Sequence, residues 1–178
     1  ADIITSRAAW RIETGQLSDG IVPSIGIRGF AAITPDLGTL KVIIARLFYQ
    51  NIALGSDGKQ TQASSPPNFS LLGVQWSLIP AGVNRYQLKN VQTGNYLAQA
   101  SGTDLIKLDT QATFDGSQYW EITPDAQYNN IVYTLKNVLT GKNLNTPQGD
   151  LSVGAQFTAT TPNLNNWPQR FKLIPVPN

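Results

Sequence analysis

The sequence predicts an all-β protein in which a unit of four strands occurs three times. The segment 85–97, RYQLKNVQTGNYL, returns almost letter for letter at 132–144 as VYTLKNVLTGKNL. A closing phrase, an aromatic residue followed within a few residues by proline, ends at Pro80, Pro124 and Pro175. Recurrence at 20–50 residues indicates equivalent structural units. The 15 glycines, 11 prolines and only 13% charged residues favour short strands joined by turns over long helices.

The repeated segments are predicted to be strands joined in hairpins. Tyr86 and Leu88 alternate with polar neighbours, as do Trp120 and Ile122 in the closing phrase. A period of two is typical of a strand with one wet face. Thr-Gly pairs at 93–94 and 140–141 then supply the turns, because glycine adopts positive φ at little steric cost. Three such four-stranded units are expected to close on one another, since closure removes exposed strand edges.

The first third of the chain departs from this pattern. No Thr-Gly hairpin precedes Trp76 at the expected distance, and Ser24–Ile33 and Thr39–Leu54 are both candidates for the first strand. The β-branched and aromatic residues within Lys41–Tyr49 favour a strand there over a short helix. Ser56–Asn68 is predicted to be a long polar loop, which in a compact domain is functional or mobile.

We therefore expect a single domain over residues 1–178. Its repeats are predicted at approximately 24–80, 85–124 and 131–175, with residues 1–20 as an N-terminal arm or extra strand.

Composition excludes several classes of function. The net charge of +2 is spread along the chain, so neither nucleic acid nor a membrane is an expected partner. No apolar run approaches the ~18 residues of a membrane span. The absence of both cysteine and histidine removes Ser-His and Cys-His catalysis and the common metal sites, so we expect no enzyme activity, no metal and no cofactor. The start of the sequence lacks the layout of a signal peptide, and a cytoplasmic location is expected.

Three four-stranded repeats in a closed arrangement are similar to a β-trefoil. The phrase Gln-x-aromatic, at Gln118–Trp120 and Gln169–Phe171, and the LKNVxTG hairpin resemble the ricin B-type lectin family, particularly its cysteine-free fungal members. The resemblance is good over residues 85–176. It implies a non-enzymatic lectin, often dimeric and often defensive, that binds galactose-type or related glycans or glycoproteins through shallow loop sites.

The resemblance also implies which residues contact sugar. In the family, an Asp after the second strand binds hydroxyl groups, an aromatic ring stacks on the sugar, and an Asn precedes the Gln-x-Trp phrase. In the third repeat, Asn145 stands where the Asp is expected, Asn166 and Gln169 match the closing phrase, and Trp167 is a candidate for stacking. The alternative is structural: Gln169 ties a loop to the backbone, Trp167 packs as a cap, and Phe171 belongs to the core.

The second repeat matches less well. Asp115 takes the Asn place beside Gln118, but Ala98-Gln99 replaces the expected Asp. Asp115 and Gln118 are thus candidate sugar contacts or braces of a turn, and Trp120 is expected in the core. The first repeat offers no predicted site, and Trp76 is expected in the core.

Two alternative functions follow from the weakened sites. One is a β-trefoil protease inhibitor that binds through exposed loops, with 56–68 and 162–168 as candidate contacts. The other is a lectin-like, non-catalytic subunit that accompanies a larger protein partner.

Overall fold

The computed structural model describes residues 40–48, 51–63, 67–129, 131–147, 150–163 and 167–177. The chain divides into two units at Leu40, and the account that follows concerns the second, Lys41–Asn178. The predicted arm over residues 1–20, the candidate strand Ser24–Ile33 and the candidate site residue Asn166 lie outside the described residues. Within the described part, no helix is long and apolar enough to span a membrane.

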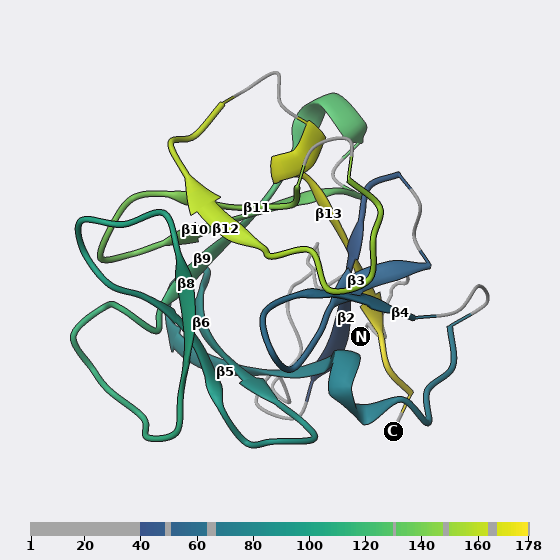
Figure 1. Ribbon diagram of the computed structural model, residues 1–178. Helices are drawn as coiled ribbons and strands as arrows, with labels where there is room; N and C mark the ends of the chain where they lie inside the picture. Colours follow the sequence, from purple (N-terminus) through teal and green to yellow (C-terminus); the bar gives the residue numbers. More distant parts are fainter. Residues whose placement is uncertain are drawn as a thin grey trace, which may run out of the picture. The chain divides into compact units, whose positions relative to one another are not determined.

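Twelve strands in the described part fall into three sets of four (Figure 1). The first set is β2 (Lys41–Arg46), β3 (Ile52–Leu54), β4 (Gln60–Gln62) and β5 (Gln75–Gly82). The second is β6 (Arg85–Asn90), β7 (Tyr96–Gln99), β8 (Ile106–Asp109) and β9 (Trp120–Pro124). The third is β10 (Tyr133–Asn137), β11 (Asn143–Asn145), β12 (Thr158–Thr160) and β13 (Phe171–Pro175). Short 3-10 turns, η2 (Leu72–Val74), η3 (Ala126–Tyr128) and η4 (Trp167–Gln169), join some of them.

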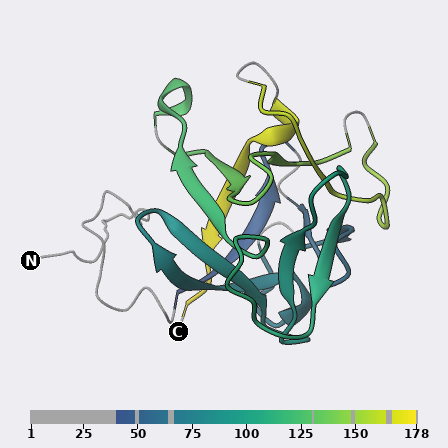
Figure 2. The same cartoon turned by 90° about the vertical axis from the view of Figure 1, so that its left-hand side faces the viewer.

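Six of the strands close into an antiparallel barrel. The pairing runs β10–β13–β2–β5–β6–β9 and returns from β9 to β10. The last strand of the chain, β13, thereby lies beside β2 in both views (Figures 1 and 2). Each of β2, β6 and β10 carries a further hairpin, namely β3–β4, β7–β8 and β11–β12. The predicted β-trefoil of three four-stranded repeats is confirmed.

The core is built from equivalent positions of the repeats. Trp76, Trp120 and Phe171, which open or nearly open the fourth strand of each repeat, are all fully buried, as predicted. The indole N–H of Trp76 donates to the Leu54 carbonyl oxygen, and that of Trp120 donates to the Leu97 carbonyl oxygen. A buried tryptophan needs such a partner, because an unpaired N–H in an apolar interior is costly.

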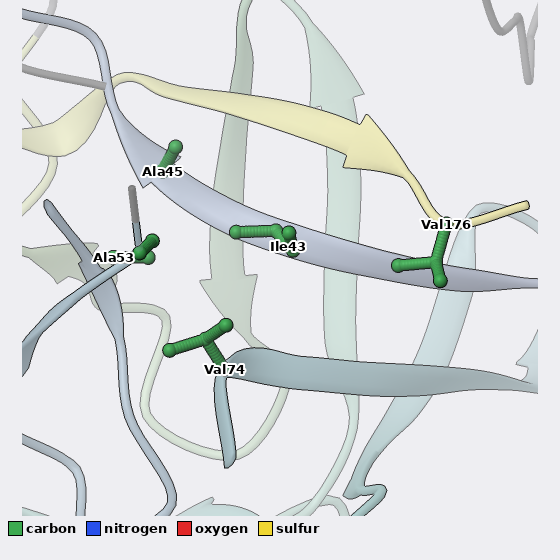
Figure 3. Packing of buried hydrophobic residues seen from close by; sticks show 6 residues of the cluster. Ile43, Ala45, Ala53, Val74 and Val176 are labelled. Carbon is green, nitrogen blue, oxygen red and sulfur yellow. The ribbon is translucent and has the colours of Figure 1, made fainter. Parts of the chain in front are cut away.

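A second apolar cluster is formed mainly by residues of the first repeat (Figure 3). Ile43 and Ala45 of β2 form one cluster with Ala53, Val74 and Val176, and all are nearly or fully buried. Ile43 and Ala45 share one face of β2 because strand side chains alternate, while Val42 and Ile44 occupy the other face and are also buried. Burial on both faces explains why Lys41–Arg46 reads as a nearly continuous apolar run.

The two Thr-Gly turns form as predicted, and the structure shows what orders them. The side-chain oxygen of Asn90 accepts from the backbone N–H groups of Gln92 and Thr93, and Gly94 has a φ of +75°. The side-chain oxygen of Asn137 likewise accepts from the backbone N–H groups of Leu139 and Thr140, and Gly141 has a φ of +71°. Both asparagines are buried and hold the turn by an Asx-type bond.

The first repeat carries Arg46 where the other two repeats carry this asparagine. Phe171 pairs with Arg46 as Trp76 pairs with Asn90 and Trp120 with Asn137, so the three positions are equivalent. The expectation of a single long polar loop over Ser56–Asn68 is wrong. Residues Gln60–Gln62 form strand β4, which pairs with β3, and the backbone groups of Gln60 bond to Gly154 and Ala155.

Candidate functional site

The two glutamines of the Gln-x-aromatic phrase are internal braces. Gln169 is 1% exposed; its amide donates to the Thr160 hydroxyl and the Thr161 carbonyl oxygen, while its oxygen accepts from Asn163 N and Asn143 Nδ2. These four bonds use both donors and both acceptor positions of the side chain. A glycan would have to break this network to contact Gln169.

Gln118 makes the matching set of bonds in the second repeat. Its amide donates to Asp109 Oδ2 and the Gln111 carbonyl oxygen, and its oxygen accepts from Thr113 N and Gln87 Nε2. The side chain is fully buried. The geometry therefore favours the structural role for both glutamines over direct contact with sugar.

Asn145 lies at the end of β11 with an acceptor oxygen that is free of bonds within the described part. Its amide donates to the Thr146 carbonyl oxygen at 2.9 Å and to the Thr158 hydroxyl of the paired strand β12 at 3.4 Å. The side chain is half-buried. Asn145 Oδ1 and the Thr158 hydroxyl thus present an acceptor and a donor-acceptor group side by side at the strand end.

Trp167 is brought close to Asn145 by the turn η4. The N–H of Thr146, the residue after Asn145, donates to the Pro168 carbonyl oxygen at 2.9 Å. The indole ring is half-buried and packs against β2 and the residues that follow it. The guanidinium carbon of Arg46 lies 5.2 Å from the ring centroid, and the ring of Phe48 meets it edge-on at 5.4 Å.

Sequence reasoning missed Thr158, Arg46 and Phe48 as neighbours of the third-repeat site. Arg46 is fully buried, donates to Gln60 Oε1, and donates to the carbonyl oxygens of Pro147 and Asp150. The available signal was the arginine at the position where the other repeats carry asparagine. A long cation at that position reaches the third repeat, whereas asparagine holds its own turn.

Asp115 stands on the surface in a bonded turn. Its Oδ1 accepts from the N–H and hydroxyl of Ser117 and from the hydroxyl of Thr113. The side-chain and backbone bonds from Ser117, followed by that from Thr113, hold the pKa of Asp115 below its usual value. This exposed carboxylate remains ionised in neutral solution.

The residues equivalent to Asn145 in the other repeats have no side-chain hydrogen-bond acceptor. Leu97 pairs with β8 as Leu144 pairs with β12, so Ala98 takes the place of Asn145 in the second repeat. The next residue, Gln99, is fully buried and bonds to Thr103, Ala159 and Thr140. Gly55 takes the place in the first repeat, where an added Cβ would lie 2.0 Å from the Thr61 hydroxyl oxygen. The third repeat is therefore the one with a polar side chain at this position.

The structure brings Asn145, Trp167 and Gln169 together, and places Asp115 and Gln118 together in the second repeat. The third repeat carries two hydrogen-bonding groups at the end of β11 and an aromatic ring on the adjoining turn η4, a combination suited to binding hydroxyl groups and an apolar ring face. In the described part of the chain, no group of three Asp, Glu, His or Cys side chains is arranged to hold a metal ion. The assignment of particular residues to ligand contact stays a prediction.

Comparison with known families agrees with the fold. Residues 73–159 match the sequence model of the family described as ricin-type beta-trefoil lectin domain-like. A search of curated proteins finds no match. The predicted resemblance to the ricin B-type lectin-like β-trefoil family is confirmed, and it supports a carbohydrate-binding lectin as the class of protein.

Solved structures share the fold at low sequence identity. A mosquitocidal holotoxin is similar with a TM-score of 0.64 and 19% identity, over 78% of this chain but only 17% of that chain. The designed threefold-symmetric protein ThreeFoil matches at a TM-score of 0.60 and 19% identity, over 75% of this chain and 97% of that one. The ricin B-like lectin of Macrolepiota procera, solved with lactose, matches at 0.60 and 16% identity, over 75% and 94%. Identity this low establishes the shared β-trefoil fold alone.

Proposed function

We propose that this protein is a non-enzymatic lectin that binds galactose-type or related glycans through the third repeat. The observation that carries the proposal is the group at the end of β11, where Asn145 Oδ1 is unpaired within the described part and lies beside the Thr158 hydroxyl. The half-buried Trp167 belongs to the adjoining turn η4, which bonds to Thr146 through Pro168. The lactose complex of the similar Macrolepiota procera lectin supports a galactose-containing ligand.

A single site of this kind is expected to bind weakly. Asn145 is neutral, and a neutral acceptor forms weaker hydrogen bonds than a carboxylate does. One face of Trp167 is already engaged by Arg46, which reduces the area left for a sugar ring. Useful binding to glycoproteins would then depend on avidity, either from two copies of the chain or from a ligand with several termini.

The test is binding of lactose by the full chain, measured by titration calorimetry and on a glycan array. We expect Asn145→Ala to abolish binding, and Asn145→Asp to strengthen it by about tenfold because charge-assisted bonds to hydroxyl groups are stronger. Asn95→Ala is the matched control, since Asn95 belongs to the turn of the second repeat and should leave binding unchanged. Equal binding by Asn145→Ala and the unchanged chain would refute the proposed site.

One observation favours a protein partner as a second candidate function. Phe69, Leu71 and Leu72, on the segment that follows β4, are 39%, 38% and 47% exposed. Apolar side chains gathered on one surface segment are typical of a protein contact. This supports a role as a protease inhibitor or as a non-catalytic subunit of a larger assembly. Inhibition assays against serine and cysteine proteases, and co-purification of a larger chain that Leu72→Asp abolishes, distinguish these roles from glycan binding.

A further inference from the structure

A surface cleft of about 550 Å³ lies over β2, β5 and β6, away from the third-repeat site. Lys41, Ser77 and Lys89 line its floor, and the Thr-Gly turn of residues 90–94 lines one side. Its volume falls in the range of small-ligand sites. All three floor residues are partly exposed, whereas Val42 and Trp76, beside them on β2 and β5, are buried.

The floor of the cleft carries two cations without a carboxylate partner. Lys41 pairs across strands with Ser77, and Ser77 pairs with Lys89, so the three residues form one row. In the part of the chain that the structure describes, neither lysine forms an ion pair. The ammonium of Lys89 lies 5.6 Å from the ring centroid of Tyr96, a neutral neighbour that holds it in place without cancelling its charge.

Two further polar groups of the cleft are free to bind a ligand. The Ser77 hydroxyl and the Gln92 amide make no hydrogen bond within the described residues. The Asn90 side chain, by contrast, is fully used in holding the turn and the Gly73 carbonyl oxygen. The free donors therefore come from two lysines, one serine and one glutamine.

The second repeat has a carboxylate in the equivalent row. Arg85 pairs across strands with Glu121, and Glu121 pairs with Lys136, which is the equivalent cation–x–cation row. Here the central residue is a carboxylate, and Glu121 Oε2 lies 3.8 Å from Arg85 Nε. Ser77 follows Trp76 as Glu121 follows Trp120, so the serine occupies the position of the carboxylate.

We propose that this cleft binds the carboxylate or sulfate group of a small ligand. The oxyanion takes the place between Lys41 and Lys89 that the Glu121 carboxylate takes between Arg85 and Lys136, and the Ser77 hydroxyl donates to it. Two cations that share one oxyanion give charge-assisted bonds, the strongest class of polar contact at a protein surface. The site uses no residue of the third repeat and stands whether or not that repeat binds neutral sugar.

Titration of the isotope-labelled full chain by two-dimensional NMR tests the site. The probes are D-glucuronate, D-glucose 6-sulfate and, as the neutral match, D-glucose, each at up to roughly 10 mM, the range that detects millimolar affinity. We expect saturable shifts of the residue 89–94 amides with one or both anionic probes, weakened by added salt, and none with glucose. The two anionic arms distinguish carboxylate from sulfate. Absence of saturation with both, or equal shifts with glucose, overturns the proposal.

Matched substitutions at Ser77 sharpen the test. Ser77→Glu places a carboxylate between the two lysines, as in the second repeat, and should weaken anion binding about tenfold or more. Ser77→Gln has a similar size without the charge and should retain most of the binding. Equal binding by the two variants would overturn the proposal. If Ser77→Glu lowers the yield of folded protein, a second pair of variants tests the site. Lys41→Gln and Lys89→Gln are each expected to weaken anion binding by a similar factor.

Discussion

At the scale of single residues, buried amides govern this protein more than charges do. Gln118 and Gln169 each satisfy four hydrogen-bonding positions on surrounding loops and strands. The first repeat has Val74 at the equivalent place, two residues before Trp76. There the neighbouring Gln75, which is 1% exposed, donates its amide to the Phe69 carbonyl oxygen. The glutamine of the Gln-x-aromatic phrase thus attaches a loop to the barrel. The presence of the phrase is therefore weak evidence that a sugar binds.

Truncating one of these amides should be costly. We expect Gln169→Ala to lower the free energy of unfolding by roughly 2–4 kcal/mol, because Asn163 N and Asn143 Nδ2 both lose a buried acceptor. Gln127→Ala, at an exposed glutamine in η3, is the control and should change stability by less than about 0.5 kcal/mol. Urea unfolding followed by tryptophan fluorescence measures both, and similar values for the two variants would show that the bonds around Gln169 add nothing.

At the scale of elements, the hairpin turns depend on interactions between near neighbours that can be predicted from the sequence. The Asn-x-x-Thr-Gly run of residues 90–94 and 137–141 combines an Asx-type bond with a glycine at positive φ. Both determinants lie within five residues, so they were predictable. The first hairpin was not predictable in this way, because Arg46 directs its side chain to Pro147 and Asp150 in the third repeat.

Gly141 offers a clean measure of backbone strain in these turns. An added Cβ would meet no atom within 4 Å, so only the φ of +71° opposes a side chain. We expect Gly141→Ala to destabilise the protein by about 1–2 kcal/mol, and Gly141→Asn by distinctly less, because asparagine tolerates the left-handed region. Thermal unfolding monitored by circular dichroism separates the two. An alanine variant as stable as the unchanged chain would contradict the assigned conformation.

At the scale of the whole molecule, closure of the barrel decides which groups are buried. Tyr86 of β6 pairs with Pro80 of β5 and Trp120 of β9, so it lies where the first and second repeats meet. Burial on this scale raises the pKa of the Tyr86 phenol to about 12. Because the folded state holds this proton more tightly than the unfolded chain does, its contribution to stability is present below pH ~10 and is lost as the pH rises toward 12.

The corresponding prediction concerns alkaline unfolding. The difference in unfolding free energy between the unchanged chain and Tyr86→Phe should fall by roughly 1 kcal/mol from pH 9 to pH 11. Taking the difference removes the contribution of the other tyrosines, which both proteins share. Denaturant titrations at the two pH values measure it, and a difference that is constant with pH would show that Tyr86 titrates as an exposed phenol does.

The sequence by itself determined the strand alternation, the two Thr-Gly turns, the threefold recurrence and the buried Trp76, Trp120 and Phe171. These features follow from hydrophobic period and from bonds between near neighbours in the chain, and both are written locally. Only the tertiary structure decided that Arg46 packs on Trp167, that Gln118 and Gln169 face inward, and that Lys41 and Lys89 flank Ser77 without a carboxylate. Those contacts join residues from different strands and repeats, and their partners are set by the register of a closed barrel rather than by spacing along the chain.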